Sequence, residues 1–309
     1  MRIIDVDYLM QNMREETSFI LRCEELFHDK ISNAAAKVLE KMVKGTRVVC
    51  MTGPSGSGKT STAYRLRDYL NNLTVPVIML CMDNFFLPND KRPPEATDFE
   101  SPYCVDMTRL IRAVHDLYQG KKVEIPSFNF VTGDYGPSQE IQGDKEAVII
   151  VEGIHMLNPL IFNALRSISI GIYASPRTRV LTSDEKVIHP HFLRVARRML
   201  RDQNTRGRSL QETVLNMETV NQGERLYITP HRFNAEIHLD TFHDYEPCIL
   251  AHYLKELPEF REELTPEFVK EHELSDLIGL VELLPPLKTN LIPRDSLLRE
   301  FIGGSIYQY

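Results

Sequence analysis

Short apolar runs alternate with amphipathic stretches along the chain from Arg47 onward. Short runs without a polar side chain are typical of buried parallel strands, whereas apolar residues spaced by three and four are typical of helices. The alternation predicts an α/β fold with a parallel sheet flanked by helices. The predicted strands are 48–51, 75–82, 147–151, 168–173 and 235–239, and the predicted helices are 61–72, 108–119, 189–203 and 245–256.

Two segments flank this pattern. Residues 1–46 place apolar positions among many charges, which predicts a helical N-terminal extension, and packing on the domain is favoured over binding to a partner. Residues 257–309 begin as an acidic segment. We expect this C-terminal extension to wrap back on the domain or to meet a neighbouring subunit.

One loop in the pattern carries a specific chemistry. Residues 53–60 read Gly-Pro-Ser-Gly-Ser-Gly-Lys-Thr, which matches the phosphate-binding loop G-x-x-x-x-G-K-[ST] between a strand and a helix. Glycines let the backbone turn its N–H groups toward phosphates, and the start of a helix favours an anion. Lys59 is predicted to reach the β- and γ-phosphates, and the Thr60 hydroxyl to bind Mg²⁺. We therefore expect Mg²⁺ and ATP, with GTP as an alternative, bound by Gly53, Ser55, Gly56, Ser57, Gly58, Lys59, Thr60 and Ser61.

Two carboxylates directly follow predicted strands. Asp83 comes after the second apolar run and Glu152 after the third. Because ligands of open α/β sheets bind at the carboxyl ends of the strands, both acids are expected beside the triphosphate. One can accept the proton of an attacking hydroxyl and the other can orient Mg²⁺. Either acid alone could equally be an ordinary strand-end residue.

A cluster of arginines stands out in a chain whose formal net charge is −7. Four of them share one face of a predicted helix, and two more flank Gly207. Any single one could lie on a solvated face. Together they predict a helical lid that closes over the triphosphate and neutralises its charge. The six are Arg194, Arg197, Arg198, Arg201, Arg206 and Arg208.

An acceptor site is expected between these parts. Segments 98–102 and 125–130 both combine aromatic and polar residues. Aromatic faces can stack on a planar ring, and Glu100 can accept hydrogen bonds from vicinal hydroxyls. For Phe128 and Phe130, the residues alone favour core packing.

Composition excludes other classes of function. A net charge of −7 argues against nucleic-acid binding, and no apolar run approaches the ~20 residues of a membrane span. The five cysteines are scattered without a C-x-x-C pair, so neither a disulfide framework nor a zinc site is expected. We expect a cytoplasmic protein with a small-molecule substrate and no nucleic-acid or membrane partner. A homo-oligomer remains open.

Together, these motifs resemble the uridine kinase and phosphoribulokinase family of P-loop kinases, in its bacterial nucleoside kinase branch. The resemblance covers roughly residues 47–256. Its ordered motifs are Asp-Asn-Phe-Phe at 83–86, Phe-Glu-Ser-Pro at 99–102, Val-Glu-Gly-Ile at 151–154, and the lid sequence at 197–208. It implies a P-loop kinase domain at 47–256 with a lid at about 189–222, between the extensions 1–46 and 257–309.

The resemblance also implies a role for individual residues. Asp83 is implied as the general base, with Lys59, Arg201 and Arg206 at the phosphates. Thr60, Glu152 and Asp83 are implied at Mg²⁺. The implied acceptor-binding residues are Phe86, Phe99, Glu100, Phe128, Phe130, Arg198 and Arg208.

The chain departs from the family pattern at the acceptor site. Family members that act on uridine and cytidine have Tyr-Asp-Phe in the segment that matches 128–130, and a base-contacting His where this chain has Gly133. Glu100 replaces the usual Asp, and Phe86 the usual Tyr. A pocket without these polar groups loses discrimination between acceptors.

Three functions therefore compete. The first is an ATP-dependent kinase acting on the 5′-hydroxyl of a nucleoside such as uridine or cytidine. The second is a kinase for another alcohol, such as a sugar phosphate or a pantothenate-like acid. The third is a regulatory nucleotide-binding protein or hydrolase, which is disfavoured because the sequence contains neither N-K-x-D nor Leu-Ser-Gly-Gly-Gln.

Overall fold

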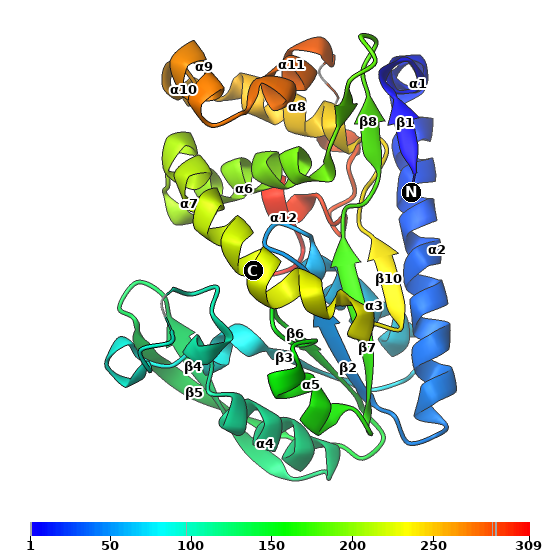
Figure 1. Ribbon diagram of the computed structural model, residues 1–309. Coiled ribbons are helices and arrows are strands. Elements are labelled where there is room, and N and C mark those ends of the chain that lie inside the picture. The colour runs from blue at the N-terminus through cyan, green and yellow to red at the C-terminus, as the bar shows by residue number, and fades with distance from the viewer. Residues whose placement is uncertain (1, 97, 286, 288) are drawn as a thin grey trace.

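A five-stranded parallel sheet forms the centre of the computed structural model, which describes residues 2–96, 98–285, 287 and 289–309 (Figure 1). Its strand order is β10-β7-β2-β6-β3, so the strand before the phosphate loop is paired on both sides. The predicted parallel sheet is thereby confirmed. The strands are β2 (Val48–Thr52), β3 (Val77–Cys81), β6 (Val148–Glu152), β7 (Ser169–Ser175) and β10 (Ile237–Asp240).

Side chains of β2 alternate between two hydrophobic cores, one on each face of the sheet. Val49 and Met51 belong to the core built with α2 (Glu16–Met42) and α3 (Lys59–Asn72). Val48 and Cys50 belong to the core built with α4 (Met107–Tyr118) and α5 (Pro159–Leu165). All four side chains are fully buried, which explains the wholly apolar strand sequence. Figure 1 shows α2 running beside α3 along the sheet.

The N-terminal extension is not wholly helical. Its first element, β1 (Ile3–Asp5), pairs in parallel with β8 (Arg179–Leu181), which pairs with β9 (Val187–Ile188). The prediction of an all-helical extension is wrong at this point, because three alternating residues are too few to show a period in sequence. Helices α1 (Val6–Asn12) and α2 make up most of the rest.

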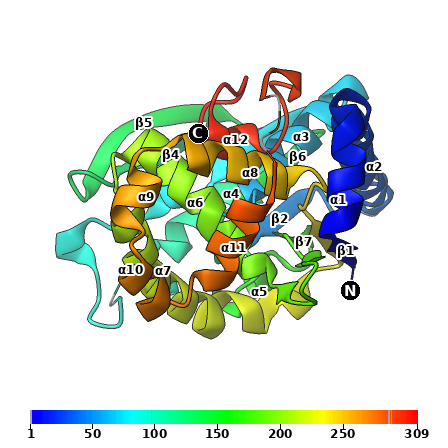
Figure 2. The same cartoon turned by 90° about the horizontal axis from the view of Figure 1, so that it is seen from above.

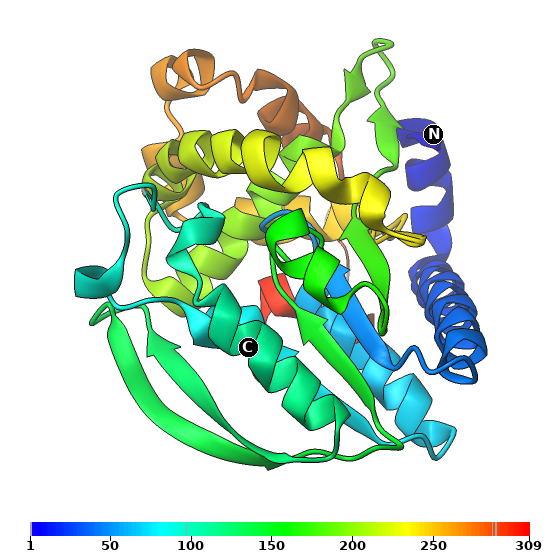
Figure 3. The same cartoon turned by 60° about the horizontal axis from the view of Figure 1, so that its bottom comes forward.

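An antiparallel hairpin was also missed by the sequence pattern. Strands β4 (Lys122–Asn129) and β5 (Asp134–Gln142) pair beside α4 and extend away from the central sheet (Figure 3). Most of β5 is exposed and polar, so it lacks the apolar alternation by which strands are recognised. The hairpin brings segment 125–130 to the carboxyl end of the sheet, next to residues 82–85.

The lid consists of α6 (Pro190–Arg206) and α7 (Leu210–Gly223), joined through Gly207. The C-terminal helices cover its outer side (Figure 2). Among the described residues, no helix is long and apolar enough to cross a bilayer. The division into 1–46, 47–256 and 257–309 stays a prediction. The remaining helices are α8 (Glu246–Glu256), α9 (Glu259–Glu263), α10 (Pro266–Glu271), α11 (Ser275–Leu283) and α12 (Arg299–Ile302).

Candidate active site at the phosphate loop

The phosphate loop is held from outside by the lid helix and by the residue after β10. The carbonyl of Ser55 accepts from Arg194 Nε at 3.0 Å, and that of Gly56 from Arg197 Nη1 at 3.2 Å. The Ser57 carbonyl accepts from the Thr241 hydroxyl at 2.6 Å. Because the N–H and C=O of a peptide point in opposite directions, binding the carbonyls outward leaves the loop's remaining N–H groups for an anion.

Helix α3 begins directly after this loop. Its N-cap, Gly58, has φ 80° and provides no side-chain cap. The first N–H groups of a helix have no partner within it, so those at Lys59, Thr60 and Ser61 are available to phosphate oxygens. The Ser61 hydroxyl does not add to them, because it donates to the buried carboxylate of Glu300 at 2.5 Å.

The two predicted carboxylates lie side by side at the end of the sheet. Cys81 of β3 is in register with Glu152 of β6, and Asp83 follows two residues later. Burial raises the pKa of both acids, and the charge of Lys59 opposes that rise at each. The Cys81 thiol donates to Glu152 Oε1 at 3.1 Å, while Oε2 is buried with no hydrogen-bond partner among the described residues.

These oxygens fit Mg²⁺. The cation prefers a site with one or two carboxylates completed by substrate phosphates. The unpaired Oε2 of Glu152 is such a ligand, and Asp83 lies beside it at the end of the sheet. Thr60, in the first turn of α3, is the third residue predicted at the metal.

Four lid arginines converge on one buried acid that the sequence analysis missed. Asp202 has no exposed surface and forms ion pairs with Arg201 at 2.9 Å, Arg206 at 3.4 Å and Arg198 at 3.5 Å. Arg208 lies 4.0 Å from the same carboxylate. The signal was present in the sequence, because Asp202 stands four residues from both Arg198 and Arg206 on the helix.

The structure brings the predicted phosphate-side arginines to the predicted base. The charges of Arg206 and Arg201, after that of Lys59, lower the pKa of Asp83 against the rise caused by burial. Lys59, Asp83, Arg201 and Arg206 therefore act on one another electrostatically. Their catalytic roles stay predictions.

Three lid arginines, Arg198 among them, contact the phosphate loop. Arg197 is completely buried and forms a bidentate ion pair with Glu246, at 2.5 and 2.8 Å. Arg194 pairs with Glu224 at 2.7 Å. Arg198 donates to the Ser55 hydroxyl, and burial together with the charge of Arg201 lowers its pKa to about 10. A solvated face would leave these side chains exposed, so that interpretation is wrong for these three.

Four of the predicted acceptor residues form an aromatic cluster. Phe86, Phe99, Phe128 and Phe130 contact one another with ring centroids 5.0–6.2 Å apart. The guanidinium of Arg92 lies 4.1 Å from the Phe99 centroid. Core packing, which the residues alone favoured, is wrong for Phe130, whose surface is 52% exposed. The cluster is exposed to solvent at Phe99 and Phe130.

Glu100 follows Phe99 of the aromatic cluster and is within electrostatic reach of the phosphate loop. Burial raises its pKa to about 7, against the opposing charges of Arg198 and Lys59. Its Oε2 is buried without a hydrogen-bond partner among the described residues, as are both ring nitrogens of His155. His155 is fully buried and packs against the backbone of Glu100. Sequence analysis missed this histidine, although it follows the Glu-Gly-Ile motif directly.

The backbone explains why no side chain occupies position 133. Gly133 has φ 69°, in the left-handed region, and a Cβ there would lie 2.2 Å from Asn89 Nδ2. The Asn89 N–H also donates to the Gly133 carbonyl at 3.1 Å. A histidine at this position would be strained and would displace Asn89.

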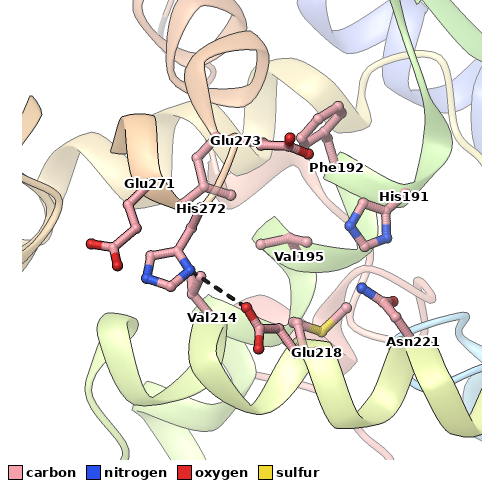
Figure 4. A pocket seen from close by; sticks show the side chains of 11 residues that line it. His191, Phe192, Val195, Val214, Glu218, Asn221, Glu271, His272 and Glu273 are labelled. Atoms are coloured by element: carbon pink, nitrogen blue, oxygen red, sulfur yellow. Dashed lines mark ion pairs between the residues drawn. The ribbon is translucent and has the colours of Figure 1, made fainter. Parts of the chain in front are cut away.

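A separate cavity of about 260 Å³ lies between the lid helices and the segment after α10 (Figure 4). His272 Nδ1 lies 3.8 Å from Glu218 Oε1 across it, and His191 faces it from α6. None of the site residues predicted from sequence lines this cavity. The predicted chemistry therefore belongs to the phosphate loop rather than to this cavity.

A phosphate loop at the end of β2, two strand-end acids and an arginine lid define the class of P-loop kinases. Residues 48–246 match the phosphoribulokinase/uridine kinase family, which is more than half of the chain. The chain belongs to this family, and the predicted resemblance is confirmed. Its members are kinases, so a small-molecule kinase with a nucleotide-binding site follows for this chain.

The chain is also similar to individual proteins. A uridine kinase from Brevibacillus brevis is 30% identical over 195 residues, which cover 62% of this chain and 82% of that protein. The inorganic pyrophosphatase TTM2 of Arabidopsis thaliana is 28% identical over 124 residues, 40% of this chain but only 17% of that protein. Among solved structures, phosphoribulokinase from Rhodobacter spheroides matches with a TM-score of 0.43 at 15% identity, covering 63% of this chain and 70% of that one.

Proposed function

We propose that this kinase transfers the γ-phosphoryl group of ATP to the 5′-hydroxyl of a nucleoside, with uridine and cytidine as acceptors. The observation that carries the proposal is the position of Asp83. The charges of Lys59 in the phosphate loop and of Arg201 and Arg206 in the lid lower the pKa of Asp83 against the rise caused by burial, and Asp83 in turn raises the pKa of Glu100. This position supports a base that acts between the bound triphosphate and an acceptor hydroxyl.

Each residue of the site has its own role in the proposed reaction. Asp83 accepts the proton of the acceptor hydroxyl while the hydroxyl oxygen attacks the γ-phosphorus. The bond from that phosphorus to the β–γ bridging oxygen then breaks and releases ADP. Lys59, Arg201 and Arg206 stabilise charge on the transferring group. Mg²⁺, held by Thr60 and Glu152, would neutralise the phosphate oxygens when bound.

Acceptor recognition has two parts. The four phenylalanines provide faces on which a planar ring can stack, and Glu100 provides a carboxylate that can accept hydrogen bonds from ribose hydroxyls. The base-edge contacts of the uridine and cytidine enzymes have no counterpart at Phe128 and Gly133. We therefore expect weak discrimination between nucleobases.

The same aromatic cluster also suits a second class of acceptor. Four apolar rings with Arg92 stacked on one of them could also hold the apolar part of another alcohol, such as a pantothenate-like acid whose carboxylate pairs with Arg92. The two classes differ in their need for a planar ring.

The test is ADP release from Mg·ATP against a panel of uridine, cytidine, purine nucleosides, sugar phosphates and pantothenate. Lys59→Ala serves as the control for adventitious turnover. Turnover that depends on a nucleoside and disappears in the control supports the proposal. Turnover only with an acceptor lacking a nucleobase would replace it with the second class, and hydrolysis with no acceptor dependence would contradict both.

A further inference from the structure

The last fourteen residues of the chain pack against the phosphate loop, although they lie outside the part that matches the kinase family. This C-terminal strap, residues 296–309, includes the short helix α12, which lies beside α6 of the lid (Figure 1). Glu300 and Tyr309 of the strap reach Ser61 of α3. Nothing in the phosphoryl-transfer scheme above uses it. We propose that residues 296–301 of the strap are part of the nucleotide site, with Glu300 as a positioning residue that fixes the phosphate loop for ATP.

Glu300 acts at the first turn of α3. Its Oε2 accepts from the Ser61 hydroxyl at 2.5 Å, and Tyr309 at the chain end places its hydroxyl 3.0 Å from the same Ser61 oxygen. Glu300 is only 9% exposed. A hydrogen bond to a buried carboxylate is stronger than one between neutral groups, so it fixes the turn that presents N–H groups to the phosphates.

Two apolar residues of the strap support the loop from other sides. Leu297 packs so closely on Gly58 that a Cβ there would lie 2.7 Å from Leu297 Cδ1. The ring of Phe301 faces Arg197, whose guanidinium lies 5.0 Å from the ring centroid. The same guanidinium donates to the Gly56 carbonyl. Both side chains are fully buried. The strap thus contacts the glycine before Lys59 and the arginine that orients the loop.

The strap is also tied to the rest of the molecule. Ser296 donates to Glu24 of α2 at 2.6 Å, and Asn204 of the lid helix donates to the Phe301 carbonyl at 3.3 Å. Farther along α3, the Tyr307 hydroxyl donates to Asp68 at 2.8 Å. The last contact anchors the strap without approaching the phosphate loop, which makes it a matched control.

The experiment compares Glu300→Gln, Ser61→Ala and their double variant with Tyr307→Phe, using calorimetric titration with Mg·ATP in the absence of an acceptor. We expect Glu300→Gln and Ser61→Ala each to weaken ATP binding about tenfold, which is the usual worth of one charged hydrogen bond. The double variant should lose no more than either single one, because both remove the same contact. Tyr307→Phe should stay within about twofold of wild type.

Three results would overturn the inference. They are unchanged ATP affinity in both single variants, additive losses in the double variant, or tighter ATP binding in Glu300→Gln because a negative charge near the triphosphate has been removed. The Ser61→Ala arm leaves the strap intact, so the test stands even if Glu300→Gln does not fold.

A second readout separates positioning from general destabilisation. We expect KM for ATP to rise in Glu300→Gln with KM for the acceptor unchanged, whereas a loosened fold would change both. The inference rests on the proposed function only through ATP binding. Normal ATP binding without any acceptor turnover would contradict the proposed function and leave the strap unaffected.

Discussion

In the proposed mechanism, the chemistry depends most directly on Asp83. Replacing it by Asn keeps the shape and removes the proton acceptor. We expect kcat to fall by about 10²–10⁴, the usual contribution of a general base, with ATP affinity nearly unchanged. Steady-state kinetics with uridine and titration with ATP would measure the two quantities. Full activity in Asp83→Asn would exclude it as the base.

Glu100 gives the acceptor site a pH dependence of its own. Burial raises the pKa of its carboxyl to about 7, so the acid is protonated below that pH and a charged acceptor of hydrogen bonds above it. We expect kcat/KM for the nucleoside to rise with pH through about 7. In Glu100→Gln this step should disappear while any dependence due to Asp83 remains. An identical pH profile in the variant would contradict the assignment.

Whether a site residue could be predicted from the sequence depends on its residue type and on the pattern around it. The phosphate loop and the acids Asp83 and Glu152 were predicted because each has a fixed place relative to a strand. His155 and Glu300 were not, since a single acid or histidine has no pattern until the fold shows what it contacts. Asp202 was missed although its spacing from Arg198 and Arg206 indicated the ion pairs. The burial of Arg194, Arg197 and Arg198 against the phosphate loop likewise depends on the fold, because helical spacing alone does not show which side chains are buried.

At the scale of elements, the lid helix and the phosphate loop form one unit. Arg197 joins them: it is fully buried, pairs with Glu246 of α8, and donates to the Gly56 carbonyl. Removing one partner of a buried ion pair leaves the other charge unpaired in a low-dielectric interior.

We therefore expect Arg197→Met to lower the free energy of unfolding by about 3–5 kcal/mol. Denaturant titration would measure it. The matched control is Lys186→Met, which removes an exposed ion pair with Asp184 (3.5 Å) and should cost about 0–1 kcal/mol. Equal stability of the two variants would show that the Arg197 pair does not hold the unit together.

Elements that lie in the central sheet were predictable, and those outside it were not. Strands β2, β6 and β7 are buried along their whole length, so their sequences are largely apolar and their ends differ from prediction by only a few residues. The β4–β5 hairpin and β1 lie at the periphery, where exposed polar positions hide the period. Partner choice, such as β1 with β8, is a long-range property that no local pattern contains.

At the scale of the whole molecule, the N-terminal extension is part of the core. Phe19, Phe27 and Ile31 of α2 are fully buried in the same cluster as Val49 and Met51 of the central sheet. The extension also adds β1 to the small sheet formed with β8.

We therefore expect a fragment of residues 47–309 to expose this apolar surface and to aggregate, or to unfold without cooperativity. Size-exclusion chromatography and thermal unfolding followed by circular dichroism would measure this outcome, with the full chain as control. A monomeric fragment with a sharp unfolding transition would contradict this prediction, because it would show that the domain folds without residues 1–46.

The central claim is that the site moves a phosphoryl group from ATP to a nucleoside hydroxyl. The most direct measurement uses ATP labelled at the γ-phosphate, with an equimolar mixture of uridine, cytidine, sugar phosphate and pantothenate, and identifies the labelled products by chromatography and mass spectrometry. The account predicts label in uridine and cytidine 5′-monophosphates, lost in Asp83→Asn. Label found only in inorganic phosphate, or only in an acceptor without a nucleobase, would contradict it.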